Sequence, residues 1–178
     1  MMRIRTERLS LRRLKMGDWR RLLRLDADFS ASPYAAYDLP WPKDRRGIRS
    51  LTRQFVDTHL FFAVLLGRKM IGYICFCEED GAYDVSYLIH SEHQGCGYAG
   101  EALAAALVYV ARTEPVLRFT AMSASENLPS KRLLNRFGFC EKERIPLSLR
   151  KDENGDPVIL ETVIFELPVK KIGKEEEL

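Results

Sequence analysis

The sequence predicts one α+β domain, built on a mixed, mainly antiparallel sheet of about seven strands that is flanked by about four helices. The 178 residues are 46% hydrophobic and 30% charged, which suits a globular domain with a sizeable core. Some short segments alternate apolar and polar residues, and others repeat apolar residues at helical spacing. No repeat or linker divides the chain, so the expected domain covers residues 1–167 and a charged tail covers 168–178.

Residues 1–59 predict one strand and two helices. The opening segment alternates apolar and polar residues, which is typical of a strand. An aspartate precedes each of two segments with helical spacing, where its carboxylate can cap the first turn. A loop with three prolines separates these helices, because proline cannot continue a helix. The strand is expected within 1–14, and the helices at 19–26, after Asp18, and at 45–59, after Asp44.

Three strands are expected next, at 60–66, 69–78 and 83–89, with turns that begin at Gly67 and Gly81. The third of these strands is the central one. Its alternation places two sets of side chains on opposite faces of the sheet. One face carries Tyr83, Val85, Tyr87 and Ile89, and the other carries Asp84, Ser86, Leu88 and His90.

The remaining chain predicts a helix, a strand, a second helix and a closing hairpin. Apolar residues recur every three or four positions in the first helix. Gly138 can end the second helix in a left-handed conformation. Asn154 and Gly155 are a strong turn signal for the hairpin. The elements are expected at 97–111, 117–121, 129–137, 140–150 and 157–167.

A glycine-containing turn, His93–Glu101, joins the central strand to the helix that follows it. The first N–H groups of a helix have no partner within the helix, and the helix dipole favours an anion there. Gly95 and Gly97 lack a Cβ, so the backbone can approach a ligand closely. The turn therefore favours a phosphate-bearing ligand, although two glycines can also form an ordinary tight turn. The Gly-Lys-Ser/Thr of a Walker A loop is absent.

Two motifs resemble those of the GNAT acetyltransferases. Gln94-x-x-Gly97-x-Ala99 is similar to the acyl-CoA loop of that family, and the segment from Asn127 to Phe139 resembles its Asn-x-x-Ser helix ending in Gly-Phe. The likeness is to the Rim group, which acetylates the N-termini of ribosomal proteins. It implies a GNAT-like fold, an acetyltransferase domain, acetyl-CoA as co-substrate, and an amine acceptor that is a protein N-terminus or a small molecule.

The resemblance also implies how acetyl-CoA is held. The loop amides would bind the pyrophosphate, and the pantetheine would lie beside the central strand like an added strand. In this family a bulge separates the strand pair there, and one free N–H, near Leu88 or Ile89, polarises the thioester carbonyl. The expected cofactor-binding residues are Leu88, Ile89, Gln94, Gly95, Cys96, Gly97, Tyr98, Ala99, Asn127 and Ser130.

Asp84 and Ser130 are the expected catalytic residues. Asp84 stands where the Rim group often has a glutamate base, and Ser86 and His90 on the same face could pass a proton; alternatively, Asp84 pairs with an arginine. Leu134 stands where many GNAT enzymes have a tyrosine acid. Ser130 is then the nearest hydroxyl for the CoA thiolate, unless it only caps its helix.

The proline-containing loop corresponds to a region that helps to line the acceptor pocket in GNAT enzymes. Its aromatic rings suit an amine or a peptide terminus, but they could also close the edge of the core. The expected substrate-binding residues are Tyr34, Tyr37, Trp41 and Ser86.

The net charge of +3 is unevenly distributed, because residues 1–53 contain 14 basic and 6 acidic residues. Aromatic residues are sparse among these charges, so a solvated basic surface is favoured over a nucleic-acid partner.

The longest apolar run is too short to span a membrane, and no signal peptide is evident. The four cysteines lack zinc or disulfide spacing, so a cytoplasmic protein without a metal is expected. Cys96 could be a reactive thiol or an ordinary loop residue.

The leading interpretation is therefore an acetyl-CoA-dependent N-acetyltransferase that transfers the acetyl group directly to a primary amine. The alternative is an acyl-CoA-binding sensor or partner module with little turnover. A homodimer is one possible assembly.

Overall fold

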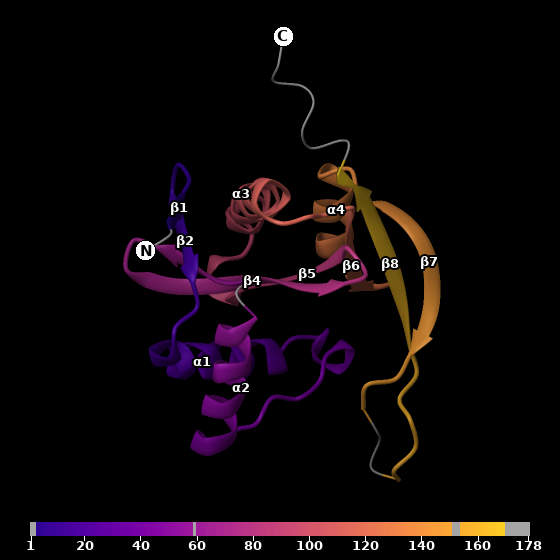
Figure 1. Ribbon diagram of the computed structural model, residues 1–178. Coiled ribbons are helices and arrows are strands. Elements are labelled where there is room, and N and C mark those ends of the chain that lie inside the picture. The colour runs from indigo at the N-terminus through magenta and orange to yellow at the C-terminus, as the bar shows by residue number, and fades with distance from the viewer. Residues whose placement is uncertain (1–2, 59, 151–153, 170–178) are drawn as a thin grey trace.

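In the computed structural model, which describes residues 3–58, 60–150 and 154–169, an eight-stranded sheet separates two pairs of helices (Figure 1). The strand order is β1-β2-β3-β4-β5-β6-β8-β7, and β5 and β6 form the parallel pair among otherwise antiparallel neighbours. This confirms the predicted α+β class. The strands are β1 (Arg3–Arg5), β2 (Leu9–Arg13), β3 (Phe61–Leu66), β4 (Lys69–Glu79), β5 (Ala82–Ile89), β6 (Arg118–Ala124), β7 (Cys140–Leu147) and β8 (Leu160–Pro168).

The α-helices α3 and α4 cover one face of the sheet, and α1 and α2 cover the other (Figure 1). The predicted Asp44 cap is confirmed, since its carboxylate accepts from the amides of Arg46 and Gly47 at the start of α2. At the start of α4, the Asn127 side chain accepts from the amide of Ser130. The helices are α1 (Trp19–Ser30), α2 (Arg45–Asp57), α3 (Tyr98–Thr113) and α4 (Leu128–Arg136), with short 3-10 turns η1 (Met16–Asp18), η2 (Ala35–Tyr37) and η3 (Ser91–His93).

Two local expectations were wrong. The opening segment forms a hairpin of two strands, with Arg5 opposite Ser10, where one strand was expected. Asp18 precedes α1 but makes no side-chain cap, because its carboxylate accepts two hydrogen bonds from the buried Arg12 guanidinium, at 2.7 and 2.9 Å. At the other end of the chain, β8 reaches Pro168, and residues 170–178 of the predicted tail lie outside the described residues, as do residues 151–153 of the closing hairpin.

Each face of the sheet has its own buried core. Tyr83, Val85 and Ile89 of β5 pack with α3 in the larger core. On the other face, Tyr73 of β4 packs with Leu22 and Leu25 of α1 in the smaller core. Burying one large apolar side chain contributes roughly 1.5–3 kcal/mol, so both layers hold β5 firmly in place.

The parallel pairing of β5 with β6 is short. It runs from Ala82 opposite Arg118 to Asp84 opposite Thr120 and then stops. Beyond this point β5 follows β4 as far as Ile89, while β6 follows β8 as far as Ala124. The β4–β5 register shows no shift, so the strands separate here without the bulge that the resemblance implied. The opening between β5 after Asp84 and β6 after Thr120 is called the seam below.

Candidate functional site

The phosphate-binding loop predicted at 94–99 enters α3 through two left-handed glycines. The φ angles of Gly95 and Gly97 are +74° and +81°, a region that side chains rarely adopt. Gly97 is the N-cap of α3, so its neighbours present the unpartnered amides of the first helical turn. The residues from Gln94 to Gly97 are exposed, and their backbone is therefore accessible to an anion.

Arg8 lies over this loop, and sequence analysis missed it. Its guanidinium donates to the Cys96 carbonyl at 2.9 Å and to the Glu101 carboxylate at 2.6 Å, and it stacks 4.7 Å above the Tyr98 ring. A Cβ built on Gly97 would lie 3.4 Å from Arg8 Nη2. The opening hairpin thus brings a cation to the loop from about 90 positions away, which no local motif could indicate.

The orientation of the β5 amides follows from two hydrogen bonds. The amide of His90 donates to the Ile71 carbonyl on β4 at 2.8 Å, and the Gln94 side chain donates to the Ile89 carbonyl at 2.8 Å. Because backbone groups alternate along a strand, Ile89, Tyr87 and Val85 direct theirs away from β4, towards the seam. Of the two amides expected to polarise a thioester, that of Ile89 faces the seam and that of Leu88 faces β4.

Asp84 lies at the closed end of the seam, on the sheet face that α1 and α2 cover. This face is called the acceptor face here, because the resemblance implies that the acceptor binds on it. Thr120 donates to its carboxylate at 3.1 Å. Burial raises the pKa of Asp84, and the Thr120 hydrogen bond opposes part of that rise. Among the described residues Asp84 forms no ion pair, so the alternative of a partner arginine is not what the structure shows.

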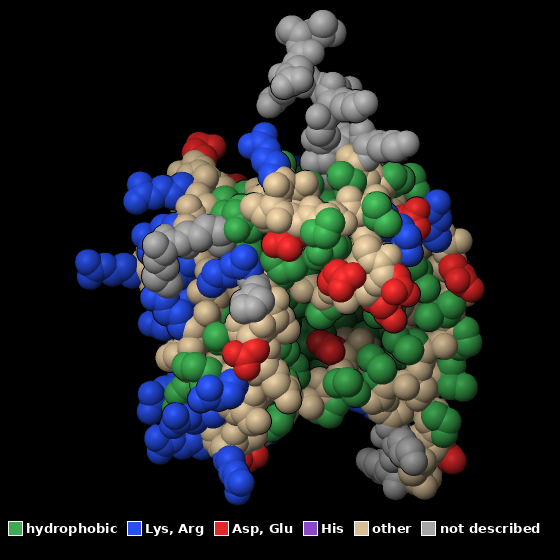
Figure 2. All heavy atoms as spheres, in the orientation of Figure 1, with side chains coloured by type: hydrophobic (Ala, Val, Ile, Leu, Met, Phe, Trp, Pro, Cys, Tyr) green, Lys and Arg blue, Asp and Glu red, His purple; other side chains and the backbone are tan. Residues whose placement is uncertain are grey.

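A second carboxylate, Asp38, also belongs to the acceptor face, and sequence analysis missed it because it lies in the loop before α2. Burial raises its pKa as well. Burial and the neighbouring Cys77 raise the pKa of the half-buried Cys75 thiol, and Asp84 and Asp38 lie close enough to add to this rise. Arg150 donates to the Asp38 carbonyl at 3.0 Å and so links this loop to the β7–β8 connection. Figure 2 shows a hollow between these two parts, with an acidic side chain inside and hydrophobic side chains around it.

The predicted substrate residues occupy different environments. Trp41 packs against Phe55 and Tyr73, with ring centroids 5.3 and 6.0 Å apart, so its ring closes the edge of the smaller core. Tyr34, the N-cap of η2, and Tyr37, its last residue, are half-buried, and Ser86 is exposed on the acceptor face. His90 shares that face but contacts Asp28 and Glu92 beyond the end of β5, so it does not join Asp84 and Ser86 in a proton path.

On the opposite face, α4 places Ser130 at the seam. Asn127 caps the helix through the Ser130 amide at 3.1 Å, so the Ser130 hydroxyl is not the cap. That hydroxyl lies 2.9 Å from the phenol oxygen of Tyr87 on β5. Leu134 is fully buried in the larger core. Tyr87 was expected on this face, but its contact with Ser130 depends on packing that the sequence does not show.

Two further properties concern the described residues only. They contain no group of three His, Cys, Asp or Glu side chains that could hold a metal ion. None of their helices is long and apolar enough to cross a membrane.

The sheet with its seam, the glycine-containing loop at the start of α3 and the capped α4 define an acyltransferase of the acyl-CoA-dependent type. Residues 8–140 match the model of the acetyltransferase (GNAT) domain, and the chain belongs to this family. The activity it carries is therefore the transfer of an acetyl group from acetyl-CoA.

Relatives support the same assignment. The chain is 27% identical over 141 residues to the uncharacterized N-acetyltransferase YnaD of Bacillus subtilis, covering 77% of this chain and 82% of YnaD. A structure of RimL, a ribosomal L7/L12 alpha-N-protein acetyltransferase in complex with coenzyme A, matches with a TM-score of 0.77 at 18% identity over 94% of this chain and 98% of that one. A spermidine N-acetyltransferase SpeG chimera from Vibrio cholerae and hSSAT matches with a TM-score of 0.76 at 20% identity, over 95% and 100%. At these identities the two structures show a shared fold.

Proposed function

We propose that the protein transfers the acetyl group of acetyl-CoA directly to a primary amine, on a protein N-terminus or on a small molecule. The observation that carries this proposal is the placement of two polar groups on opposite faces of one seam. Asp84 lies on the acceptor face, and the Tyr87–Ser130 pair lies on the α4 face. An amine can then approach the thioester from one face while the thiolate leaves towards the other, with no covalent enzyme intermediate.

The loop and the seam would hold acetyl-CoA. The amides from Gly95 to Ala99 bind the pyrophosphate, and the Arg8 guanidinium, which is also paired with Glu101, lies beside them. The pantetheine runs along β5, whose Val85, Tyr87 and Ile89 amides face the seam, and Asn127 contacts it from α4. The Ile89 amide polarises the thioester carbonyl.

The acceptor face suits an amine. Protonated amines must lose a proton before they attack, and a carboxylate with a raised pKa removes that proton more readily. Asp84 supplies this base, and Asp38 adds a second carboxylate with a raised pKa, which favours a cationic acceptor. RimL and the spermidine acetyltransferase act, by their names, on a protein N-terminus and on a polyamine. Both acceptors present the primary amine that this site requires.

An Asp84→Asn variant tests the proposal. We expect kcat/KM for an amine acceptor to fall by on the order of 10²-fold or more, while acetyl-CoA still raises the unfolding temperature. The exposed Asp57→Asn variant on α2 is the matched control and should keep full activity. An unchanged rate for Asp84→Asn would remove this residue from the mechanism. Binding of acetyl-CoA without transfer to any amine would favour the sensor alternative.

A further inference from the structure

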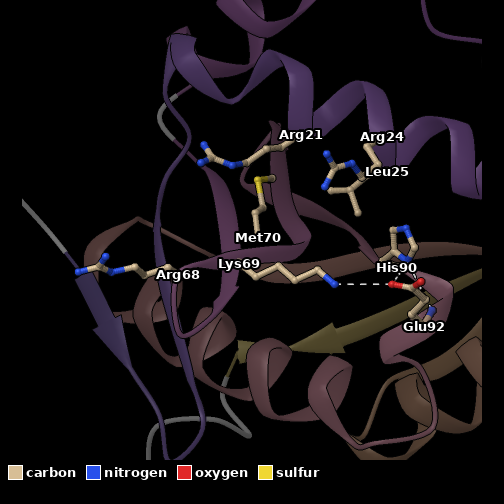
Figure 3. Close-up of a pocket in the computed structure, with 8 residues that line it drawn as sticks. All are labelled: Arg21, Arg24, Leu25, Arg68, Lys69, Met70, His90 and Glu92. Atoms are coloured by element: carbon tan, nitrogen blue, oxygen red, sulfur yellow. Dashed lines mark hydrogen bonds and ion pairs between the residues drawn. The ribbon is translucent and has the colours of Figure 1, made fainter.

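A second cavity lies between α1, the β3–β4 turn and the end of β5, with a volume of about 440 Å³. Figure 3 shows Arg24 reaching from α1 and Lys69 lying along the opposite wall, with His90 and Glu92 at one end. His90 follows Asp84 by six residues, which places this cavity about 20 Å from the predicted base along the strand. The lining residues are Arg21, Arg24, Leu25, Arg68, Lys69, Met70, His90 and Glu92.

The cavity carries an excess of positive charge. Four cationic side chains line it, against the single carboxylate of Glu92. Arg21 lies 2.8 Å from Asp18, but that carboxylate also binds Arg12. Lys69 and Glu92 are 3.6 Å apart, and both side chains are more than half exposed, so their pairing is weak. Arg24 and Arg68 form no ion pair with any described carboxylate.

The walls of the cavity are fixed by the core beneath them. Leu25 and Met70 are 2% and 8% exposed and belong to the smaller core, which joins α1 to β4. Arg24 and Lys69 are each adjacent in sequence to one of these buried residues, so their backbones are held on opposite walls. Guanidinium and ammonium groups held on two facing walls can both bind the oxygens of a phosphate. The volume falls in the usual range for small-molecule sites, roughly 300–1,000 Å³.

We propose that this cavity binds a small polyanion that carries phosphate groups and is distinct from CoA. The charge of the cavity excludes the acceptor amine, which is a cation. None of the loop residues from Gln94 to Ala99 lines the cavity, and the 3-10 turn Ser91–His93 connects the cavity residue His90 to that loop. The hydrogen bonds from Ser91 to Asp28, at 2.8 Å from the amide and 2.5 Å from the hydroxyl, fasten this turn to α1.

Calorimetric titration of pyrophosphate into the full chain, saturated with acetyl-CoA, tests this site. We expect one pyrophosphate to bind per chain. Arg24→Gln combined with Lys69→Gln should weaken this binding about tenfold or more. The matched control combines Arg49→Gln with Arg53→Gln on α2, which removes the same charge from exposed positions outside the cavity and should leave the affinity unchanged.

Three results would overturn the proposal. Pyrophosphate that binds only in the absence of acetyl-CoA would occupy the CoA loop. An equal loss of affinity in both double variants would indicate diffuse attraction to a basic surface. Weaker binding of CoA, but not of dephospho-CoA, in the cavity variant would assign the cavity to the 3′-phosphate of CoA. If acetyl-CoA fails to bind the wild-type chain, the proposed function fails, and the two variants titrated with pyrophosphate alone still test the cavity.

Discussion

The hydroxyl oxygens of Tyr87 and Ser130 lie 2.9 Å apart and join β5 to α4 across the seam. Burial raises the pKa of Tyr87, and its hydrogen bond with Ser130 opposes part of that rise. The phenol therefore keeps its proton at neutral pH and can supply it through the serine. We therefore predict that Tyr87 acts, from the central strand, as the phenol acid that Leu134 cannot be on α4.

Removal of this phenol should slow the chemical step. We expect Tyr87→Phe to lower kcat about tenfold or more and to leave the KM for acetyl-CoA nearly unchanged. Ser130→Ala should have a similar effect, and the double variant should be no slower than the slower single variant, because the two hydroxyls act as one unit. Steady-state kinetics with the three variants measures this. Tyr109→Phe, on α3, is the control, and independent multiplicative losses for Tyr87 and Ser130 would contradict the pairing.

Asp84 should contribute to activity at a cost in stability. The folded protein holds the Asp84 proton more tightly than the unfolded chain does, since burial raises its folded pKa. The ionised side chain therefore disfavours folding at pH values above its unfolded pKa of about 3.9. Asp84→Asn should raise the unfolding temperature at pH 7, and the difference should vanish below about pH 4. Thermal unfolding across this pH range measures it, and a lower unfolding temperature for the variant at pH 7 would refute the expectation.

The anion site at the start of α3 can be tested with two substitutions of nearly equal size. Asparagine and aspartate tolerate a left-handed φ better than other side chains, so Gly97→Asn and Gly97→Asp should strain the backbone similarly. Only the aspartate adds a negative charge, which repels the pyrophosphate and competes for Arg8. Acetyl-CoA at about 100 times its Kd should stabilise a binding-competent chain by roughly 2.7 kcal/mol. We expect this shift with Gly97→Asn and its loss with Gly97→Asp; equal shifts would place the phosphates elsewhere.

The buried ion pair of Arg12 with Asp18 should make a large contribution to the loss of stability at acidic pH. Burial alone would raise the pKa of Asp18, but the hydrogen bonds and charge of Arg12 lower it overall. This stabilisation is complete above the unfolded pKa of about 3.9 and is lost as the pH falls through the lower folded pKa. Asp18→Asn leaves a buried guanidinium without its counter-charge, so the free energy of unfolding at pH 7 should fall by about 3–5 kcal/mol. Urea unfolding at pH 7 and pH 3 measures this loss, and a fall of similar size in the exposed Asp57→Asn variant would contradict it.

Most of the fold could be predicted because its signals are local. The alternation in β5, the aspartate before α2 and the glycine pair before α3 each act within a few residues. Gly138 illustrates the point, since its φ of +81° ends α4 and lets the Phe139 amide bond to the Leu134 carbonyl, as its position suggested. The opening hairpin was missed because Thr6, whose hydroxyl satisfies the turn, carries no strong turn signal.

The candidate site was less predictable, because it depends on contacts between distant segments. Arg8 reaches the CoA loop, Asp38 reaches the acceptor face, and Tyr87 meets Ser130 only after the sheet has formed. For His90 the predicted face of β5 was correct, but this did not bring it to the candidate site. His90 instead lines the cavity beside α1. The sequence also did not show where the basic residues of the N-terminal third gather. They lie over α1, α2 and the opening hairpin, at the left of Figure 2.

The seam also bears on how the chain unfolds. Strands β1 to β5 are consecutive antiparallel neighbours, whereas β6, β8 and β7 form a second group that joins them through three pairs of residues in the sheet. The backbone pairing between the groups is therefore short, and the larger core beneath α3 and α4 supplies the other contacts that hold them together. A molecule bound along the seam contacts both groups at once. Acetyl-CoA bound in the seam would therefore strengthen the coupling between the two strand groups during unfolding.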